Sequence, residues 1–166
     1  MLERLGFQWN PGVIAAGVVA YRATSPIYLT PFPDTAPTLL KLRDAGYKLG
    51  VASKERAVKQ WQKPIQIGLT HLFHAVTISE ETRSEALATE TLLKTLEKLG
   101  SVEPEKAIFL ACDLAHEIAI ANKADIVTIR MRTGTNRAST PKKPDEKPFF
   151  EIDELSDLFD VLQLKT

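Results

Sequence analysis

The chain has 166 residues, 44% hydrophobic and 25% charged, so it can bury one substantial core but is short for two domains. Its 21 Lys and Arg residues balance 21 Asp and Glu residues, which excludes an overall charge that attracts nucleic acid or an anionic membrane. One cysteine excludes an intrachain disulfide, and no apolar run approaches the ~20 residues of a membrane span. We therefore expect one soluble domain over residues 1–166, cytoplasmic and without a membrane partner.

Residues 1–30 are the least defined part of the chain. Within them the segment PGVIAAGVVAY, residues 11–21, is rich in small apolar residues. Such a segment fits either a helix packed closely on a neighbour or a buried strand, and its periodicity does not distinguish the two.

The segment TAPTLLKLRDAGYKLGVAS begins a regular alternation of elements. A helix is predicted from Thr35, with leucines at helical spacing and Gly46 as a left-handed stop. A strand is predicted directly after it, over residues 47–52.

The alternation continues to about residue 100. A helical pattern over 54–62 is limited by Pro64, and HAVTIS, residues 74–79, predicts a second strand. A longer helix is predicted over 84–99, with four leucines on one face and Gly100 behind the last of them.

The next segments complete the pattern. AIFLAC, residues 107–112, is a continuous apolar run typical of a strand buried on both faces of a parallel sheet. A helical stretch over 114–124 leads to another strand over 125–131. Helix and strand thus alternate throughout, which predicts a three-layer α/β domain with a parallel sheet.

The C-terminal part changes in composition. Residues 132–148 are polar, basic and rich in proline, which predicts a mobile loop. Residues 149–164 predict an acidic amphipathic helix that packs on the body of the domain. Its apolar side would consist of Ile152, Leu155, Leu158, Phe159 and Leu162.

The order of the segments NPGVIAAGVVAY, PFPDTAPTLLKLRDAGYKLGVAS, FHAVTIS, EKAIFLACDLAHEI and DELSDLFDVL resembles archaeal-type hydrolases of the haloacid dehalogenase superfamily over nearly the whole chain. The resemblance implies a Rossmann-like core with strand order 5-4-1-2-3 and four motifs at the carboxyl ends of its strands. The family's first strand, which carries a nucleophilic Asp-x-Asp motif, has no counterpart here. Residues 1–30 would then be a remnant of the helical cap or an N-terminal extension.

The second and third family motifs are only partly retained. Ser53 occupies the position of the family's phosphate-binding Thr or Ser, although a helix N-cap is the simpler interpretation. Glu85 and Ala86 stand where the resemblance implies a lysine, so that cation is absent.

The fourth motif, which holds Mg²⁺ in the family, is also altered. Ala111 and Cys112 replace the Gly-Asp pair, and a thiol is a poor ligand for magnesium. Asp113 and Glu117 are the remaining candidate metal ligands. Their structural alternatives are an N-cap for Asp113 and a first-turn charge for Glu117.

With the nucleophile, the lysine and the first metal-binding acid absent, the resemblance favours a non-catalytic protein without a cofactor. We would then expect a protein-binding module or a subunit of a heteromeric complex. The alternative is a truncated or diverged Mg²⁺-dependent phosphatase that retains Ser53, Asp113 and Glu117.

The absent strand would leave two strand edges unpaired, because its place in the family lies between strands 47–52 and 107–112. Such edges recruit partners, so a protein partner or a homo-oligomer is expected there. Alternatively the two strands pair directly, or residues 11–21 take the empty place.

A second alternative function is nucleic-acid binding through the basic segment 130–147. That segment contains no aromatic residue to stack on bases, and a solvated loop is the simpler interpretation. Its cations are Arg130, Arg132, Arg137, Lys142, Lys143 and Lys147.

Overall fold

The computed structural model describes residues 11–24, 30–54, 65, 67–79 and 88–164. The chain divides into two compact units, residues 1–30 and residues 31–166. The range 1–30, predicted to be a cap remnant or an extension of a single domain, thus coincides with the smaller unit.

The smaller unit contains helix α1 (Pro11–Thr24), which answers the choice between helix and strand for this segment. Pro11 occupies the first helical position, where its missing N–H costs nothing. The described side chains of α1 are exposed, among them Val19 and Tyr21. In the described part of the chain, no helix combines the length and the apolar character needed to cross a membrane.

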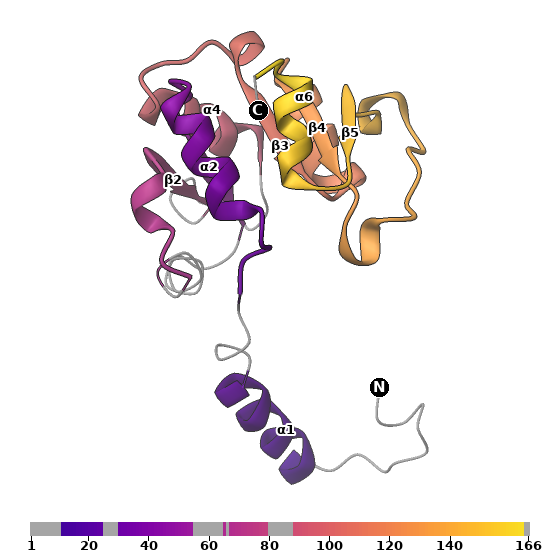
Figure 1. The fold of residues 1–166 in the computed structure, drawn as a ribbon. Coiled ribbons are helices and arrows are strands. Elements are labelled where there is room, and N and C mark those ends of the chain that lie inside the picture. The colour runs from indigo at the N-terminus through magenta and orange to yellow at the C-terminus, as the bar shows by residue number, and fades with distance from the viewer. Residues whose placement is uncertain (1–10, 25–29, 55–64, 66, 80–87, 165–166) are drawn as a thin grey trace. The chain divides into compact units, whose positions relative to one another are not determined.

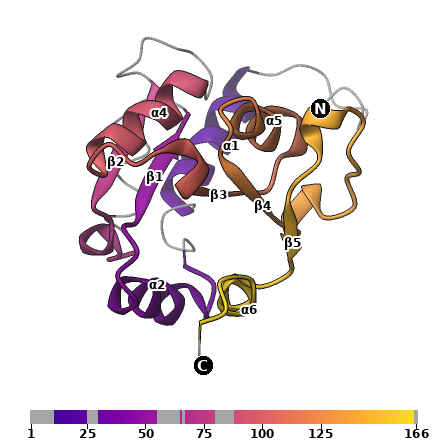
Figure 2. The ribbon, with the colours of Figure 1, turned by 90° about the horizontal axis from the view of Figure 1, so that it is seen from above.

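The larger unit contains two parallel sheets. Strands β1 (Gly50–Ser53) and β2 (Ala75–Ile78) form the first sheet. Strands β3 (Ile108–Ala111), β4 (Val127–Met131) and β5 (Phe150–Ile152) form the second, in that order. The view in Figure 2 shows the strands side by side in the order β2, β1, β3, β4, β5.

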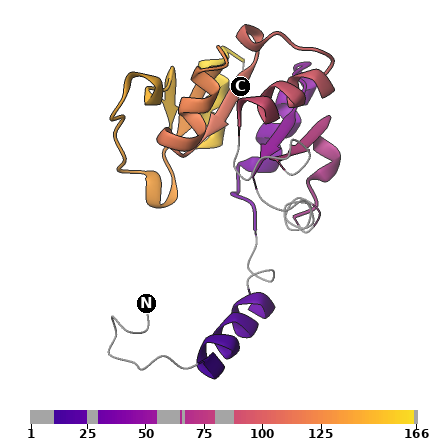
Figure 3. The same ribbon diagram turned by 180° about the vertical axis from the view of Figure 1, so that it is seen from behind.

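Helices cover both faces of these strands. Helices α2 (Thr35–Asp44) and α6 (Leu158–Val161) lie on one side, as Figure 1 shows. Helices α4 (Thr89–Lys98) and α5 (Ala119–Asn122) lie on the other, in front of the strands in Figure 3. The predicted three-layer α/β architecture with parallel strands is therefore confirmed.

Two glycines end helices as the sequence predicts. Gly46 follows α2 with φ of +87°, and Gly100 follows α4 with φ of +100°, both in the left-handed region that favours glycine. The helix predicted over 54–62 and the start of the helix predicted at 84 lie outside the described residues.

Two hydrophobic clusters lie on the two faces of the strands. The first packs α4 and α5 against the strands, and its buried members are Ala75, Leu92, Leu96, Leu99, Ala107, Ala121 and Ile126. The second packs α2 and the C-terminal segment against the other face, and its buried members are Leu42, Ile129, Ile152, Leu155 and Leu158. The first cluster touches strands of both sheets, through Ala52 and Ala75 of the first sheet and Phe109 of the second.

The C-terminal segment differs from the helix predicted over 149–164. It forms β5, then a 3₁₀ turn (Leu155–Asp157), and only then the short helix α6. Pairing decides the difference, because Met131 and Ile152 stand opposite each other in the β4–β5 register and Ile152 is buried there. The helical spacing of the apolar residues holds only after that strand.

Residues 132–148, predicted to be a mobile loop, carry local structure. They contain 3₁₀ turns at Gly134–Asn136 and Pro144–Glu146. The buried Glu146 accepts a hydrogen bond from the Lys142 backbone N–H at 2.7 Å, and the Asn122 amide donates to the Asp145 carbonyl at 2.7 Å. The first of these hydrogen bonds links two residues within the segment, and the second joins the segment to α5.

Candidate functional site

The residues of the second and fourth motifs lie at the carboxyl ends of two strands. Ser53 is the last residue of β1, and Cys112 and Asp113 follow the last residue of β3. These strands face the break between the two sheets (Figure 2). The Ser53 hydroxyl donates to the Lys54 carbonyl oxygen at 3.1 Å, so it makes no helix-capping bond within the described residues.

Asp113 is the N-cap of the turn that follows β3. Its Oδ1 accepts hydrogen bonds from the backbone N–H groups of Ala115 and His116, both at 3.0 Å. The His116 ring lies 3.2 Å from both carboxylate oxygens. The turn itself, Leu114–Ile118, is π-helical, a form that is rare and often found at functional sites.

Glu117 reaches back to the start of the same turn. Its Oε2 accepts from the backbone N–H of Cys112 at 3.2 Å and from that of Asp113 at 3.0 Å. The fold therefore brings Asp113 and Glu117 together around one turn. Each carboxylate satisfies two backbone donors that a helix start leaves without partners.

The surroundings of this turn shift two pKa values. Partial burial works to raise the pKa of Asp113, but hydrogen bonds from the His116 backbone and ring and from Ala115 together lower it. Burial raises the pKa of the Cys112 thiol, and the neighbouring Glu117 carboxylate adds to that rise. Cys112 is thus a neutral thiol and not a reactive thiolate.

The donor set at this turn does not fit a magnesium ion as it stands. Mg²⁺ requires hard oxygen ligands in near-octahedral arrangement. Here one carboxylate oxygen of Asp113 and one of Glu117 each already accept hydrogen bonds from two backbone N–H groups. Within the described residues no group of three His, Cys, Asp or Glu side chains could hold a metal ion.

The lowered pKa of Asp113 predicts a pH dependence of stability. Because the folded-state pKa lies below the unfolded value of about 3.9, the ionised carboxylate stabilises the fold above about pH 4. That contribution is lost as the pH falls through the folded-state pKa. Urea midpoints measured on the acid side should fall less steeply in Asp113→Asn than in the wild type. Parallel acid limbs in the two proteins would contradict this assignment.

Part of the predicted basic patch is engaged in ion pairs and hydrogen bonds within the fold. Arg130 is only 2% exposed, and its guanidinium donates to Glu151 Oε1 at 2.8 Å and to the Asn136 carbonyl at 2.6 Å. Arg132 and Arg137 both pair with Asp153. Three of the predicted cations therefore hold the loop in place.

The remaining cations, Lys142, Lys143 and Lys147, are exposed. The third-motif positions Glu85 and Ala86 lie outside the described residues.

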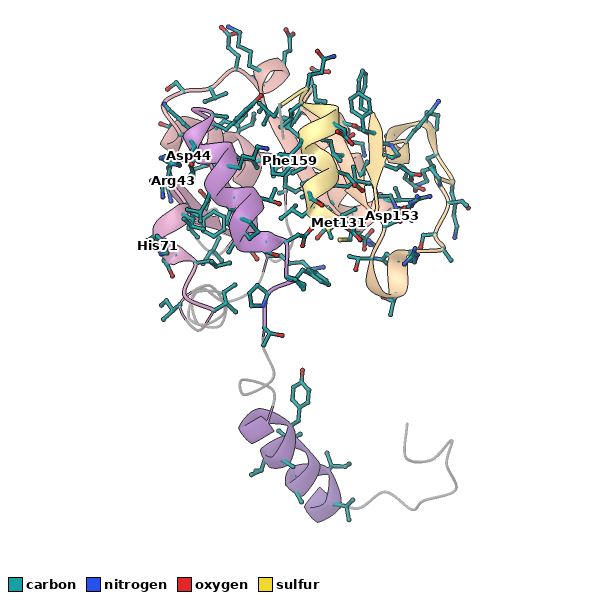
Figure 4. The ribbon with its side chains drawn as sticks, viewed as in Figure 1. Arg43, Asp44, His71, Met131, Asp153 and Phe159 are labelled. Atoms are coloured by element: carbon teal, nitrogen blue, oxygen red, sulfur yellow. The ribbon has the colours of Figure 1, made fainter. Side chains whose placement is uncertain are left out.

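A small cleft lies at the carboxyl ends of β4 and β5, with a volume of about 240 Å³. In Figure 4 Met131 and Asp153, which both line it, lie at neighbouring ends of these strands. Asp34 and Glu154 add two further carboxylates to its wall, and the Ser156 N–H donates to Asp34 at 3.1 Å. Sequence reasoning missed this acidic cleft, because it assigned the β5 residues to a helix and so did not place Asp153 at a strand end.

Comparison with known proteins identifies the relatives of this chain. A family model described as haloacid dehalogenase-like hydrolase matches residues 2–131. The chain is 42% identical over 163 residues to a glyceraldehyde 3-phosphate phosphatase of Methanopyrus kandleri, covering 98% of this chain and 70% of that protein. It is 32% identical to the protein of the same name from Pyrococcus furiosus, covering 98% of this chain and 67% of the relative.

Solved structures agree with the fold. A haloacid dehalogenase-type phosphatase from Thermococcus onnurineus superposes with a TM-score of 0.68 at 28% identity, covering 79% of this chain and 57% of that protein. A magnesium-bound hydrolase of the same type from Bacillus subtilis gives a TM-score of 0.78 at 18% identity, covering 98% and 68%. The chain thus spans little more than half of the first structure and about two thirds of the second.

These relatives correct the functional prediction. The sequence favoured a non-catalytic protein-binding module or subunit, but relatives that align over nearly the whole chain are named as phosphatases. The interpretation as a pseudoenzyme is therefore wrong, and so is a role defined by protein binding. The altered motifs were given too much weight against the similarity of the chain as a whole.

Proposed function

We propose a phosphatase function from one premise, that this chain belongs to the haloacid dehalogenase-like hydrolase family. The reaction is hydrolysis of a phosphate monoester, which releases inorganic phosphate and an alcohol. The substrate class is a small phosphorylated aldehyde or sugar, of which glyceraldehyde 3-phosphate is the first to test. The observation that carries the proposal is the 42% identity, over 98% of this chain, to a glyceraldehyde 3-phosphate phosphatase.

The site geometry supports this proposal at two positions. The Ser53 hydroxyl stands at the carboxyl end of β1 and donates to the neighbouring carbonyl of Lys54, a bond that it can exchange for one to a phosphoryl oxygen. Asp113 follows β3, where its Oδ1 caps the next turn and its Oδ2 lies 3.2 Å from Nδ1 of the His116 ring. Ligands of open parallel sheets bind at such strand ends.

The direct test is phosphate release from glyceraldehyde 3-phosphate by the purified protein. Ser53→Ala removes one donor to the phosphoryl group, so we expect kcat/KM to fall by about tenfold to a hundredfold. Ser139→Ala, an exposed serine in the loop 132–148, is the matched control and should leave the rate unchanged. Wild-type protein that releases no more phosphate than buffer, from this ester or from p-nitrophenyl phosphate, would refute the proposal.

The same assay tests the magnesium dependence that the family resemblance implies. Magnesium-supplemented and EDTA-treated reactions are compared at one substrate concentration. A rate that disappears with EDTA and returns with Mg²⁺ would show that the activity needs the ion.

A further inference from the structure

The side chain of His74 takes part in the pairing of the first sheet, at the end where β1 and β2 begin. Leu49 directly precedes β1, and His74 directly precedes β2. The backbone N–H of Leu49 donates to the ring nitrogen Nδ1 of His74 at 3.0 Å. In return, the backbone N–H of His74 donates to the Leu49 carbonyl at 2.7 Å. Two hydrogen bonds thus join these residues, and one of them uses an imidazole ring as its acceptor.

The direction of this bond fixes the protonation state of the ring. A backbone N–H can only donate, so Nδ1 of His74 must accept with its lone pair. The bond therefore forms only with the neutral ring that carries its proton on Nε2. In the imidazolium form both ring nitrogens carry a proton, and the Nδ1 proton would face the N–H of Leu49. Protonation of His74 thus removes the bond and leaves two donors opposed.

The His74 ring is exposed, so protons reach it from solvent. Two neighbouring cations are bonded to carbonyls elsewhere, since Arg43 donates to the His71 carbonyl at 2.8 Å and Lys48 to the Leu99 carbonyl at 2.7 Å. The titratable and charged residues on the elements around the ring are Arg43 and Asp44 of α2, Lys48 before β1, His71 before β2 and Lys98 of α4. The Leu49–His74 pair itself contains one titratable group, the His74 ring.

The bond lies where β1 enters the hydrophobic core. The Leu49 side chain packs against the second hydrophobic cluster. The Leu49 carbonyl also accepts the Ala75 N–H, but at 3.4 Å, so the bonds between Leu49 and His74 are the shorter ones at this end. At the other end of the pair Ser53 stands opposite Ile78. Loss of the ring bond would therefore loosen the amino end of the β1–β2 pair first.

We propose that His74 is a pH-sensitive latch of the first sheet. The neutral ring closes the amino end of the β1–β2 pair, and the protonated ring opens it. Histidine is the side chain that gains a proton between about pH 8 and pH 5, so the latch is closed in mildly alkaline and open in mildly acidic solution. The latch is a property of the fold and does not depend on the proposed phosphatase function.

The test follows amide hydrogen exchange of the full chain by NMR at about pH 7.5 and about pH 5.5, where Asp and Glu stay ionised. Each rate is divided into the rate of an unstructured peptide at the same pH, which gives a protection factor. We expect the protection factor of the Leu49 amide to fall at least about tenfold at the lower pH. The Val127 amide is the matched control, because it donates at 3.2 Å to the Ala107 carbonyl at the amino end of the second sheet.

Three variants separate the ring proton from the rest of the fold. His74→Asn places an amide oxygen near the position of Nδ1 and does not titrate, so the Leu49 amide should stay protected at both pH values within about threefold. His74→Ala has no acceptor, so the Leu49 amide should be about tenfold less protected than in the wild type at the higher pH. His71→Asn changes an exposed histidine outside the pair and should keep the wild-type response.

The ring also gives a readout that needs no variant. At about pH 7.5 the nitrogen NMR shifts of His74 should place its proton on Nε2, and a proton on Nδ1 would refute the latch. Other results would overturn it as well. These are a Leu49 protection factor that is equal at both pH values, an unchanged acid response in His74→Asn, full protection in His74→Ala, or an equal loss at Val127, which would mean that acid loosens the whole fold.

Discussion

Replacing Arg130 with methionine is expected to lower the free energy of unfolding by about 2–4 kcal/mol. The Arg130 side chain is 3% exposed, and its guanidinium satisfies Glu151 and the carbonyls of Asn136 and Arg137. Methionine fills much of the same volume but leaves these acceptors without their donor. The estimate stays below the full cost of breaking a buried pair because Glu151 is 38% exposed and keeps contact with water.

Arg132→Met is the matched control for this prediction. Arg132 pairs with Asp153, but both side chains are more than 40% exposed, so losing this pair should lower the stability much less than losing Arg130 does. Urea unfolding of the three proteins, followed by circular dichroism, measures both differences. Equal losses in the two variants would contradict the special role of Arg130 in holding the loop 132–148 on the sheet.

The second large effect is expected on activity. Asp113→Asn should lower kcat/KM for glyceraldehyde 3-phosphate by at least about a hundredfold, if Asp113 is the carboxylate that serves the phosphate site. Asparagine caps a helix about as well as aspartate, so the turn Leu114–Ile118 should keep its structure, and the stability near neutral pH should fall only by the small contribution of the ionised carboxylate. Activity and stability are thereby separated in one variant.

Asp125→Asn serves as its control. Asp125 is exposed and has φ of +56°, a conformation that asparagine also tolerates, so this variant should keep full activity. Phosphate release is measured by initial rates over a range of substrate concentrations, and folding by urea denaturation. If Asp113→Asn retains wild-type kcat/KM, then Asp113 is only an N-cap and the phosphate site lies elsewhere.

The acidic cleft and the phosphate-site residues lie at the carboxyl ends of different strands. Met131 is the last residue of β4 and Asp153 follows β5, whereas Ser53 and Asp113 border the break between the sheets. The cleft residues Asp34, Asp153 and Glu154 are all negatively charged, which disfavours an anionic substrate there. We therefore place the proposed phosphate site at the break and not in the cleft.

Contacts between distant segments join the C-terminal part to α2. Lys41 lies over the Phe159 ring, 4.3 Å from its centroid, as expected for a cation–π contact. In Figure 4 Phe159 lies beside α2, while Arg43 and His71 lie on its other side, where the Arg43 guanidinium donates to the His71 carbonyl at 2.8 Å. Helix α2 is thus joined on one side to the segment after β5 and on the other side to the segment before β2.

The sequence by itself determined the features that depend on neighbouring residues. Gly46 and Gly100 end their helices because few other residues adopt positive φ without strain. The apolar runs at 75–78 and 108–111 form strands, and Asp113 caps the turn behind the second of them. The family resemblance also came from the order of these local segments.

Only the tertiary structure decided the features that depend on distant pairing. Residues 150–152 form a strand because β4 lies beside them, although their apolar spacing continues a helical pattern. Arg130 is buried because Glu151, 21 positions away, neutralises it, and Asp34 bonds Ser156 across 122 positions. Such partners leave no local signal, because the residues around each charged side chain are the same whether or not the sheet later brings the two partners together.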